Sequence, residues 1–415
     1  MTRAQSDLRG LRAAVVLGAP EVGGAEKQAL LLGQHLTERE GMEVEVWTLQ
    51  PGSGSLREPL RQAGLPGREL ALTVPPSLTA RAAMVARLAH LFRKARIDVL
   101  LPFTTFPNLL TGLAFRLSGA KACIWNERVA DPTLAVTASH RLAASLCSAF
   151  IANAQAGAAL CTTLYGAPPA RVHLVRNGLS LAPAQQDRAA WRKRLSVNDG
   201  TLVATMIANI HERKDHATVL RAFALATKGH APGESLLVCA GDAVEDALQK
   251  LLSLAAELGI ADRVVFPGRV ADIAGLLEAS DLSVFASHAE GTPNGVLESM
   301  AKALPVIASD LPGIRDALGE ASSRWLVPAR DAEGFAERIR TLLADPVLRA
   351  SLGRQNQAIV AERFSTEQMG ARTTAVIREA LSRGPGLHLP RFPALRRSPS
   401  PSPSPSPSSI RSHRS

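Results

Sequence analysis

Apolar and polar positions alternate along this chain in two distinct ways. Short runs of about four to eight mainly apolar residues are typical of buried strands, and longer stretches with apolar residues every three or four positions are typical of amphipathic helices. In the first half, helices are most clearly expected at residues 25–39, 79–96 and 139–147. The short runs between them predict strands at residues 13–18, 44–49, 98–103, 122–126, 149–153 and 172–177.

The same alternation of short apolar runs with longer amphipathic stretches begins again near residue 200. Strands that alternate with helices form parallel sheets with helices on both faces, so two such sets predict an α/β protein with two doubly wound, Rossmann-like domains. Ligands of such sheets bind beyond the carboxyl ends of the strands, and the cleft that the two domains face is therefore the expected site. The second set comprises predicted strands at 202–209, 235–241, 264–268, 282–287, 305–309 and 325–329, and helices at about 216–227, 244–258, 273–279, 295–303 and 332–344.

Composition indicates where the domains end. We expect a first domain at residues 1–180, a second at 181–363, and a closing helix at 364–383 that crosses back to the first domain. The polar stretch 180–200, with one short basic helix, is the best candidate for the linker. Residues 384–415 contain the repeat SPSPSPSPS, which cannot build a packed core, so we expect a disordered tail.

Basic residues exceed acidic ones, and the 415-residue chain has a formal net charge of +10. Residues 1–180 hold 19 basic and 12 acidic side chains, whereas residues 181–383 are nearly neutral. A basic first half can attract an anionic membrane surface or a phosphate-bearing acceptor. Nucleic acid is not an expected partner, because no binding motif is present and aromatic residues make up only 4%.

Neither a membrane span nor a disulfide framework is expected. No apolar run approaches the ~18–20 residues that a span needs, and the first twenty residues lack a signal-peptide pattern. We therefore expect a cytoplasmic protein that is at most peripheral at the inner membrane face. Cysteines without Cys-x-x-Cys spacing or a nearby histidine are expected to be buried free thiols, and these are Cys123, Cys147, Cys161 and Cys239.

The run EGTPNGVLE at residues 290–298 carries the most chemical information. It follows an expected strand and leads into a short helix, and its Gly/Asn-rich turn leaves backbone N–H groups free at the helix start. Such a start carries partial positive charge and binds anions. Glu290 lies ahead of this start and Glu298 about one turn inside it, so hydroxyls on either side of a bound phosphate can donate to a carboxylate. This arrangement suits a nucleotide sugar; the alternative is an ordinary strand–helix loop with a solvated Glu290.

Three further pairs of glycine or basic residues lie at the ends of expected strands or ahead of the next helix. A glycine pair after the first strand lets the backbone approach a ligand closely at a helix start. A basic pair ahead of the helix near residue 216 can neutralise a diphosphate, and a Gly-Arg pair can hold the edge of a base. Each pair alone is also compatible with a tight turn or a solvated loop. The pairs are Gly23 and Gly24, Arg213 and Lys214, and Gly268 and Arg269.

Several motifs are absent from the sequence. It contains no G-x-G-x-x-G, D-x-D, H-E-x-x-H, G-x-S-x-G or G-x-x-x-x-G-K-[ST]. These absences disfavour a nicotinamide cofactor, metal-dependent sugar transfer, zinc or serine hydrolysis, and P-loop chemistry. We expect neither a metal ion nor a bound cofactor.

Taken in order, these segments resemble glycosyltransferase family 4. The resemblance rests on GGAE after the first strand, NG at 177–178, HERKDH, FPGRV, and EGTPNGVLE followed by SMAKALPVIASDLPGI. It spans residues 12–382, and the Glu-x7-Glu segment is its most specific part. Members of this family are retaining enzymes of the two-domain GT-B fold. The resemblance therefore implies transfer of a sugar from a nucleotide-diphosphate sugar to a hydroxyl acceptor.

The resemblance also implies a role for each matching residue. Glu298 would bind the ribose of the nucleotide, and Glu290 would contact the hydroxyls of the donor sugar. Backbone amides near Asn294 and Gly295 would bind the diphosphate, whose charge Lys214 would neutralise. The glycine pair of the first domain would close over the phosphates.

On the donor side the sequence departs from the family pattern. The arginine expected a few residues before Lys214 falls near Asn209, and Arg213 is the expected replacement. The usual N-G-[VI]-D reads N-G-L-S at residues 177–180, and the usual G-G-I reads P-G-I at residues 312–314.

On the acceptor side a histidine common in the family has no clear match. Asn126, Glu127 and Arg128 stand in roughly that region and are candidates to orient the acceptor. We expect a UDP-sugar as donor and a lipid-linked acceptor or a growing cell-surface glycan or exopolysaccharide as acceptor. The alternatives are a GT-B-shaped binding or scaffold protein without turnover, or a nucleotide-sugar epimerase or hydrolase.

The helix expected at residues 79–96 has a basic face beside an apolar stripe. Either it packs the stripe on the sheet and leaves its basic groups solvated, or the basic face also docks on anionic lipid. The basic residues are Arg81, Arg87, Arg93, Lys94 and Arg96.

Overall fold

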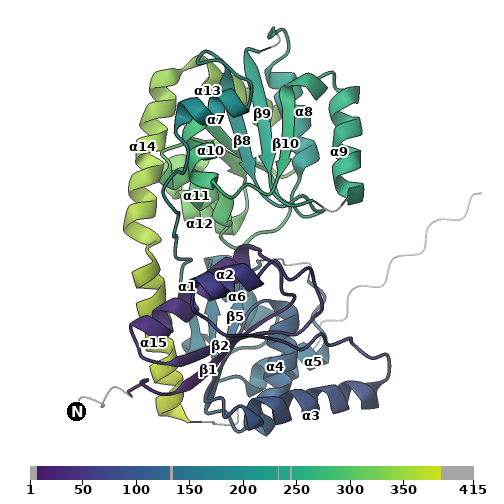
Figure 1. The fold of residues 1–415 in the computed structure, drawn as a ribbon, viewed down its shortest axis with the longest axis vertical. Coiled ribbons are helices and arrows are strands. Elements are labelled where there is room, and N and C mark those ends of the chain that lie inside the picture. Colours follow the sequence, from purple (N-terminus) through teal and green to yellow (C-terminus); the bar gives the residue numbers. More distant parts are fainter. Residues whose placement is uncertain (1–6, 131–133, 232, 244, 385–415) are drawn as a thin grey trace, which may run out of the picture.

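The structure, a computed structural model, describes residues 7–130, 134–231, 233–243 and 245–384. The tail expected at 385–415 lies outside the described residues. Two Rossmann-like α/β domains are stacked along the long axis of the molecule, and two long helices run down one side of both (Figure 1).

The first domain is built on a seven-stranded sheet in the order β3-β2-β1-β4-β5-β6-β7, paired in parallel throughout. Its strands are β1 (Arg12–Leu17), β2 (Glu43–Thr48), β3 (Gly67–Glu69), β4 (Val99–Pro102), β5 (Ala122–Glu127), β6 (Ala149–Ala152) and β7 (Val172–Leu174). Its helices are α1 (Gly24–Glu38), α2 (Arg57–Gln62), α3 (Leu78–Lys94), α4 (Thr105–Ser118), α5 (Ala138–Leu146) and α6 (Gln155–Thr163).

The second domain repeats the plan with a six-stranded parallel sheet in the order β10-β9-β8-β11-β12-β13. Its strands are β8 (Leu202–Ile207), β9 (Ser235–Ala240), β10 (Val264–Gly268), β11 (Leu282–Phe285), β12 (Val306–Ser309) and β13 (Leu326–Val327). Its helices are α7 (Arg188–Arg194), α8 (His216–Ala226), α9 (Glu245–Glu257), α10 (Ile273–Ala279), α11 (Asn294–Ala301), α12 (Pro312–Leu318), α13 (Ala332–Ala344) and α14 (Pro346–Arg363). The chain then continues into α15 (Thr366–Arg383).

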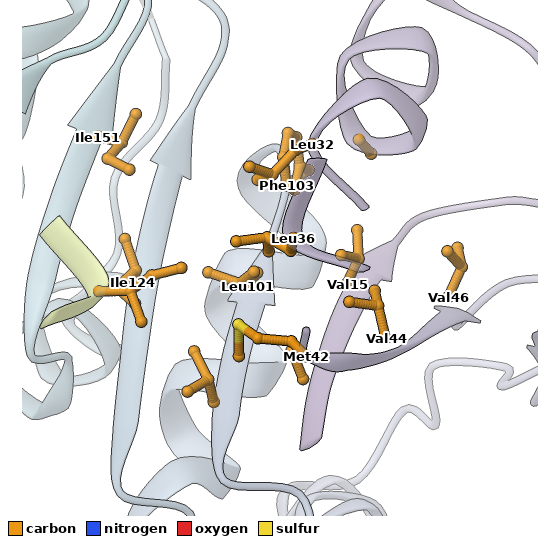
Figure 2. Close-up of a cluster of buried hydrophobic side chains, with 14 of the residues drawn as sticks. Val15, Leu32, Leu36, Met42, Val44, Val46, Leu101, Phe103, Ile124 and Ile151 are labelled. Carbon is orange, nitrogen blue, oxygen red and sulfur yellow. The ribbon is translucent and has the colours of Figure 1, made fainter. Parts of the chain in front are cut away.

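Alternation along each strand divides the core of the first domain between the two faces of its sheet. On β1, Val15 joins the cluster beneath α1, whereas Val16 joins the cluster on the opposite face, as the two-residue period of a strand requires. Figure 2 shows the α1 side, where Leu32 and Leu36 meet strand residues such as Leu101. Both faces are covered, so the strands read as continuous apolar runs.

The sequence pattern predicted the strands correctly except for one. The edge strand β3, with the sequence GRE, was not expected, because its three residues are exposed and include no apolar side chain. Helix α14 was also not expected, because its buried residues are Gly353, Asn356 and Val360 and do not form an apolar stripe. All four cysteines are buried and free, as predicted.

The segment at residues 180–200 lies packed on the second domain. Asp272, at the start of α10, accepts hydrogen bonds from the backbone N–H of Gln185 and Gln186 and from Trp191 Nε1 at 2.8–3.1 Å. Arg192, which is buried, donates to the carbonyl oxygen of Ala279 at 2.9 Å. Helix α7 therefore belongs to the packing of the second domain; the domain limits expected at 180/181 and 363/364 stay predictions.

Helix α15 packs against the first domain, whereas α14 lies beside the second (Figure 1). Met369, Val376 and Ile377 of α15 complete the cluster beneath α1. The Leu179 N–H donates to the carbonyl oxygen of Phe364 at 2.8 Å, where the chain passes between the domains. The C-terminal helix thus ties the two domains together.

Gly370→Leu should destabilise this junction. A Cβ at residue 370 would lie 2.2 Å from His35 Nδ1 of α1, so the His35 ring or the helices themselves would have to move. We expect a loss of roughly 1–3 kcal/mol in the free energy of unfolding, measured by urea denaturation. Ala371→Leu, at an exposed position of the same helix, is the control. Equal stability of the two variants would contradict the close approach of α1 and α15.

Candidate active site

The predicted site residues gather where the strand order of each sheet reverses. Ligands of doubly wound sheets bind at this switch point, which lies between β1 and β4 in the first sheet and between β8 and β11 in the second. The glycine pair 23–24 follows β1, the basic pair 213–214 follows β8, and the segment 290–298 follows β11. Three of the loops at these switch points thus carry the candidate residues.

The turn between β11 and α11 is held by close backbone contacts that only glycine allows. A Cβ at Gly295 would lie 2.1 Å from the carbonyl oxygen of Ile207 on β8. A Cβ at Gly291 would lie 2.5 Å from the carbonyl oxygen of Arg128 in the first domain, and one at Gly313 would lie 1.9 Å from the carbonyl oxygen of Gly291. The start of α11 is therefore fixed against both its own sheet and the opposite domain.

Glu290 and Lys214 form an ion pair in this site. Ser287 Oγ lies 2.6 Å from the same oxygen, Glu290 Oε1, and Lys214 Nζ lies 4.8 Å from the ring centre of Phe285. The side chains of Lys214 and Glu290 are only 16% and 12% exposed. The carboxylate is thus oriented by one ammonium and one hydroxyl group.

Backbone pairing brings these two residues together. The Asp215 N–H donates to the carbonyl oxygen of Ala286 at 3.0 Å, and the His288 N–H donates to that of Arg213 at 2.9 Å. The loop after β8 is thereby joined to the loop after β11. Arg213 takes part through its backbone, and its side chain is exposed.

His216 fixes the backbone of the loop that contains Lys214. It begins α8 and is buried, and its Nδ1 lies 3.1 Å from the carbonyl oxygen of Lys214. A carbonyl can only accept, so Nδ1 carries the proton and the ring orients the Lys214 backbone. Burial lowers the pKa of His216 to about 4, and the Lys214 charge acts in the same direction.

Glu298 is paired with a lysine from the opposite domain. It is buried one turn inside α11, and its Oε1 accepts a hydrogen bond from Lys27 Nζ of α1 at 2.8 Å. A cavity of about 360 Å³ borders both residues, and its lining includes Gln34, Ser180 and Asp272. Glu298 thus faces a space large enough for part of a ligand.

A network of amide side chains joins the domains around the start of α11. Asn294 Oδ1 accepts from Gln28 Nε2 at 3.2 Å and from Asn177 Nδ2 at 3.1 Å, and Asn294 Nδ2 donates to the carbonyl oxygen of Gly24 at 3.1 Å. Gln28 also exchanges two hydrogen bonds with the backbone of Gly178 at 2.8 and 2.9 Å. The starts of α1 and α11 therefore face each other across the cleft.

The start of α1 is formed by the predicted glycine pair. Gly24 begins the helix, and a Cβ there would lie 3.6 Å from Asn294 Nδ2. The Glu26 carboxylate lies close to Gly23. A Cβ at that glycine would lie only 2.6 Å from Glu26 Oε2. Burial raises the pKa of Glu26.

Gly268 and Arg269 lie at the edge of this arrangement. Gly268 ends β10 with φ +70°, in the left-handed region that favours glycine. Arg269 forms an ion pair with Asp242 at 2.8 Å, and its Nη2 also donates to the carbonyl oxygen of Val22 at 3.4 Å. Arg269 thus contacts the loop that precedes Gly23 in the first domain.

Asn126, Glu127 and Arg128, the candidates for orienting an acceptor, are buried. Arg128 donates to Asn126 Oδ1 at 3.2 Å and to Asn177 Oδ1 at 3.1 Å, and lies 4.6 Å from the Phe103 ring centre. Burial lowers the pKa of Arg128 to about 10 and raises that of Glu127. These contacts lie within the first domain and favour a role in positioning Asn177, whose Nδ2 donates to the carbonyl oxygen of Thr292 and to Asn294 Oδ1 in the second domain.

The sequence did not predict four residues that contribute to the site, namely Lys27, Gln28, Asn177 and Ser287. Lys27 and Gln28 directly follow the GGAE motif near the start of α1, so their position was a usable signal. Asn177 stands in an Asn-Gly pair and Ser287 at the end of a predicted strand, and neither position alone indicates a role in the site. Asn177 meets Asn294 because the two domains pack together, whereas Ser287 meets Glu290 within the turn that follows β11.

Comparisons with known proteins agree with this geometry. The sequence profile described as "Glycosyltransferase Family 4" matches residues 22–182, and that described as "Glycosyl transferases group 1" matches residues 187–358. The chain belongs to glycosyltransferase family 4. It is a transferase of the GT-B fold, as the sequence resemblance implied.

Several relatives carry the name D-inositol 3-phosphate glycosyltransferase. The protein of that name from Thermobispora bispora is 28% identical over 407 residues, covering 88% of this chain and 92% of the relative. That from Salinispora tropica is 32% identical over 222 residues, but the match spans only 50% of this chain and 46% of the relative.

Solved structures share the fold at low identity. HepE from Anabaena, in complex with UDP and glucose, has a TM-score of 0.77 and 21% identity, covering 89% of this glycosyltransferase and 100% of that chain. WaaG, described as a glycosyltransferase involved in lipopolysaccharide biosynthesis, has a TM-score of 0.65 and 18% identity, with 88% and 99% covered. Within the described residues, no helix of this glycosyltransferase is both long and apolar enough to cross a membrane.

Stability should depend on pH through His216. Its pKa is about 4 in the folded protein, below the ordinary 6.5, so protonation favours the unfolded chain. The stabilisation is complete above pH 6.5 and is lost as pH falls toward 4. From pH 7 to pH 5 we expect this one group to lower the free energy of unfolding by about 2 kcal/mol. Urea denaturation at both pH values measures it, and His216→Gln should show a correspondingly smaller decrease. An unchanged decrease in that variant would contradict the assignment.

Proposed function

We propose that this glycosyltransferase moves a hexose from a UDP-sugar to a hydroxyl of a glycan or lipid-linked acceptor, with retention of anomeric configuration and without a metal ion. The observation that carries the proposal is the position of two carboxylates, Glu290 and Glu298, on either side of the start of α11, each facing a lysine. The complexes of HepE with UDP and glucose and with UDP-glucose support the choice of donor.

The nucleoside would bind on the Glu298 side. Ribose hydroxyls are donors, and a buried carboxylate is a matching acceptor. The cavity beside Glu298 and Lys27 provides room for the nucleoside. Gly268 and Arg269, at the end of β10, remain candidates for contacts to the base. The diphosphate would then reach the N–H groups of Asn294 and Gly295, where the partial positive charge of α11 stabilises it.

The sugar would bind on the Glu290 side. Because Lys214 and Ser287 fix its carboxylate, Glu290 can accept hydrogen bonds from sugar hydroxyls without reorganising. Lys214 would in turn stabilise the charge on the departing diphosphate, and the exposed Arg213 side chain is close enough in sequence to assist. Lysine and helix starts would thus supply the positive charge that other enzymes take from a metal.

Transfer would proceed on one face of the sugar. The bond from the anomeric carbon to the diphosphate oxygen breaks, the acceptor oxygen bonds to the same face, and the acceptor proton passes to the leaving phosphate oxygen. This route needs no strong protein base, so catalysis would rest on positioning and charge stabilisation.

The two acids should give different defects. Glu298→Ala should weaken binding of both the UDP-sugar and free UDP by about tenfold or more, because the ribose is common to both. Glu290→Ala should lower turnover by about 10²–10³-fold and leave UDP affinity nearly unchanged. Calorimetry with UDP and an acceptor-dependent UDP-release assay measure the two effects. Equal loss of UDP affinity in both variants would refute the assignments, and acceptor-independent UDP release would favour hydrolysis over transfer.

We further propose that the first domain docks on anionic lipid through α3, near a lipid-linked acceptor. This helix lies at the end of the first domain farthest from the second (Figure 1). It buries Leu88, Ala89 and Phe92 and contains no acidic residue. Its outward basic residues, Arg87, Arg93 and Lys94, form no ion pair with any described residue.

Apolar side chains are exposed on the same layer of helices. Leu78 of α3 is 82% exposed, and Leu117 of α4 and Leu142 of α5 are 57% and 52% exposed. Helix α4 packs against both α3 and α5. Each basic group near an anionic surface contributes ~1 kcal/mol, and the exposed apolar side chains can insert among headgroups.

Vesicle co-sedimentation tests this docking with protein truncated after Gly384, which removes the basic tail. Binding should require anionic lipid, weaken at high salt, and fall when Arg87, Arg93 and Lys94 are changed to Gln. The matched control changes Arg221, Lys228 and Arg354, which are exposed on the second domain, to Gln. The docking proposal would be wrong if the two triple variants bound vesicles equally well, or if the truncated protein did not bind vesicles at all.

A further inference from the structure

We propose that Lys27 is a ligand of the donor diphosphate, held on Glu298 until the ribose takes its place. The inference rests on the proposed function, because it assigns a further residue to the same donor site. Lys27 lies in the first turn of α1, the helix whose start faces the start of α11 across the cleft. It therefore stands at the place where two helix starts converge.

The ion pair between Lys27 and Glu298 is suited to exchange. The Glu298 side chain is 5% exposed, whereas that of Lys27 is 46% exposed. A buried carboxylate needs a compensating partner when no ligand is present, and the half-exposed ammonium group supplies one. Ribose hydroxyls would compete for the same Glu298 oxygens. Lys27 loses little burial on leaving, and its flexible stem allows it to turn to a new anion.

Among the described residues, Lys214 and the exposed Arg213 are the cations that the second domain brings near the expected diphosphate. The arginine that the family pattern places near residue 209 is Asn209, whose Oδ1 accepts from the Asp242 N–H at 3.2 Å. Lys214 is engaged with Glu290, and Arg269 is paired with Asp242. Lys27 is a cation of the first domain that already reaches α11.

Glu26 makes an added cation more necessary. Its carboxylate lies against Gly23 at the start of α1, where it offsets part of the positive potential of that helix start. A diphosphate placed between the two helix starts would meet this negative charge. The Lys27 ammonium, one residue further along the same turn, would compensate for it.

The exchange gives Lys27 two partners in sequence. Without donor it neutralises Glu298 across the cleft; with donor, Glu298 accepts the ribose hydroxyls and Lys27 pairs with the phosphates. A single residue would thereby couple recognition of the ribose to recognition of the diphosphate. Since Lys27 belongs to the first domain and the bound nucleotide to the second, the contact would also hold the cleft closed on the donor.

Calorimetric titration of Lys27→Met and Lys27→Arg with UDP and with uridine tests this assignment. UDP affinity should fall by about tenfold or more in Lys27→Met and stay within about threefold of the starting protein in Lys27→Arg. Uridine has no phosphate, so its affinity should be unchanged or higher in Lys27→Met. Lys228→Met, at an exposed position on the second domain, is the charge-matched control and should bind both as the starting protein does.

The other outcomes overturn the inference in distinguishable ways. Undiminished UDP affinity in Lys27→Met would mean that Lys27 only blocks Glu298. Equal losses for UDP and uridine would mean that it supports the site without contacting phosphate. The starting protein is first tested with UDP, GDP and ADP, and the variants are compared with whichever binds, alongside its own nucleoside. Binding of none of the three would refute the proposed donor site itself.

Discussion

The close approach of backbone to backbone around the turn at residues 290–295 is the constraint on which the site depends. Gly295 lies against the carbonyl oxygen of Ile207, and Gly291 lies against that of Arg128 in the other domain. A side chain at either position would push α11 away from its sheet or the two domains apart. The absence of a side chain at these glycines therefore lets the start of α11 lie close to both domains.

Charge is distributed around that helix start in compensated pairs. Glu290 meets Lys214 of its own domain, whereas Glu298 meets Lys27 of the other. A buried carboxylate without such a partner would be ionised only at a large cost in free energy. The lysines therefore keep both carboxylates ionised and able to accept hydrogen bonds from hydroxyl groups. The amide network of Gln28, Asn177 and Asn294 supplies directional contacts between the domains without adding charge.

Local patterns predicted what depends on local structure. Strands such as β1 and β8 are continuous apolar runs, and the Gly/Asn-rich turn before α11 identified the helix start from sequence. The sequence pattern did not predict helix α14, because its buried residues are Gly353, Asn356 and Val360 and do not form an apolar stripe. The Lys27–Glu298 pair joins residues 271 positions apart, and no periodicity carries such information. The inward orientation of Arg128 likewise depends on Phe103 and Asn177, which are distant in sequence and come together only in the folded first domain.

The central claim is that the start of α11 holds a nucleotide sugar with its nucleoside on the Glu298 side and its hexose on the Glu290 side. A crystal structure with an unreactive UDP-hexose analogue tests it most directly. The account predicts ribose hydroxyls at hydrogen-bond distance from Glu298, the diphosphate at the N–H groups of Asn294 and Gly295, and hexose hydroxyls at Glu290. A nucleotide bound elsewhere, or bound with ribose and hexose exchanged between the two carboxylates, would contradict it.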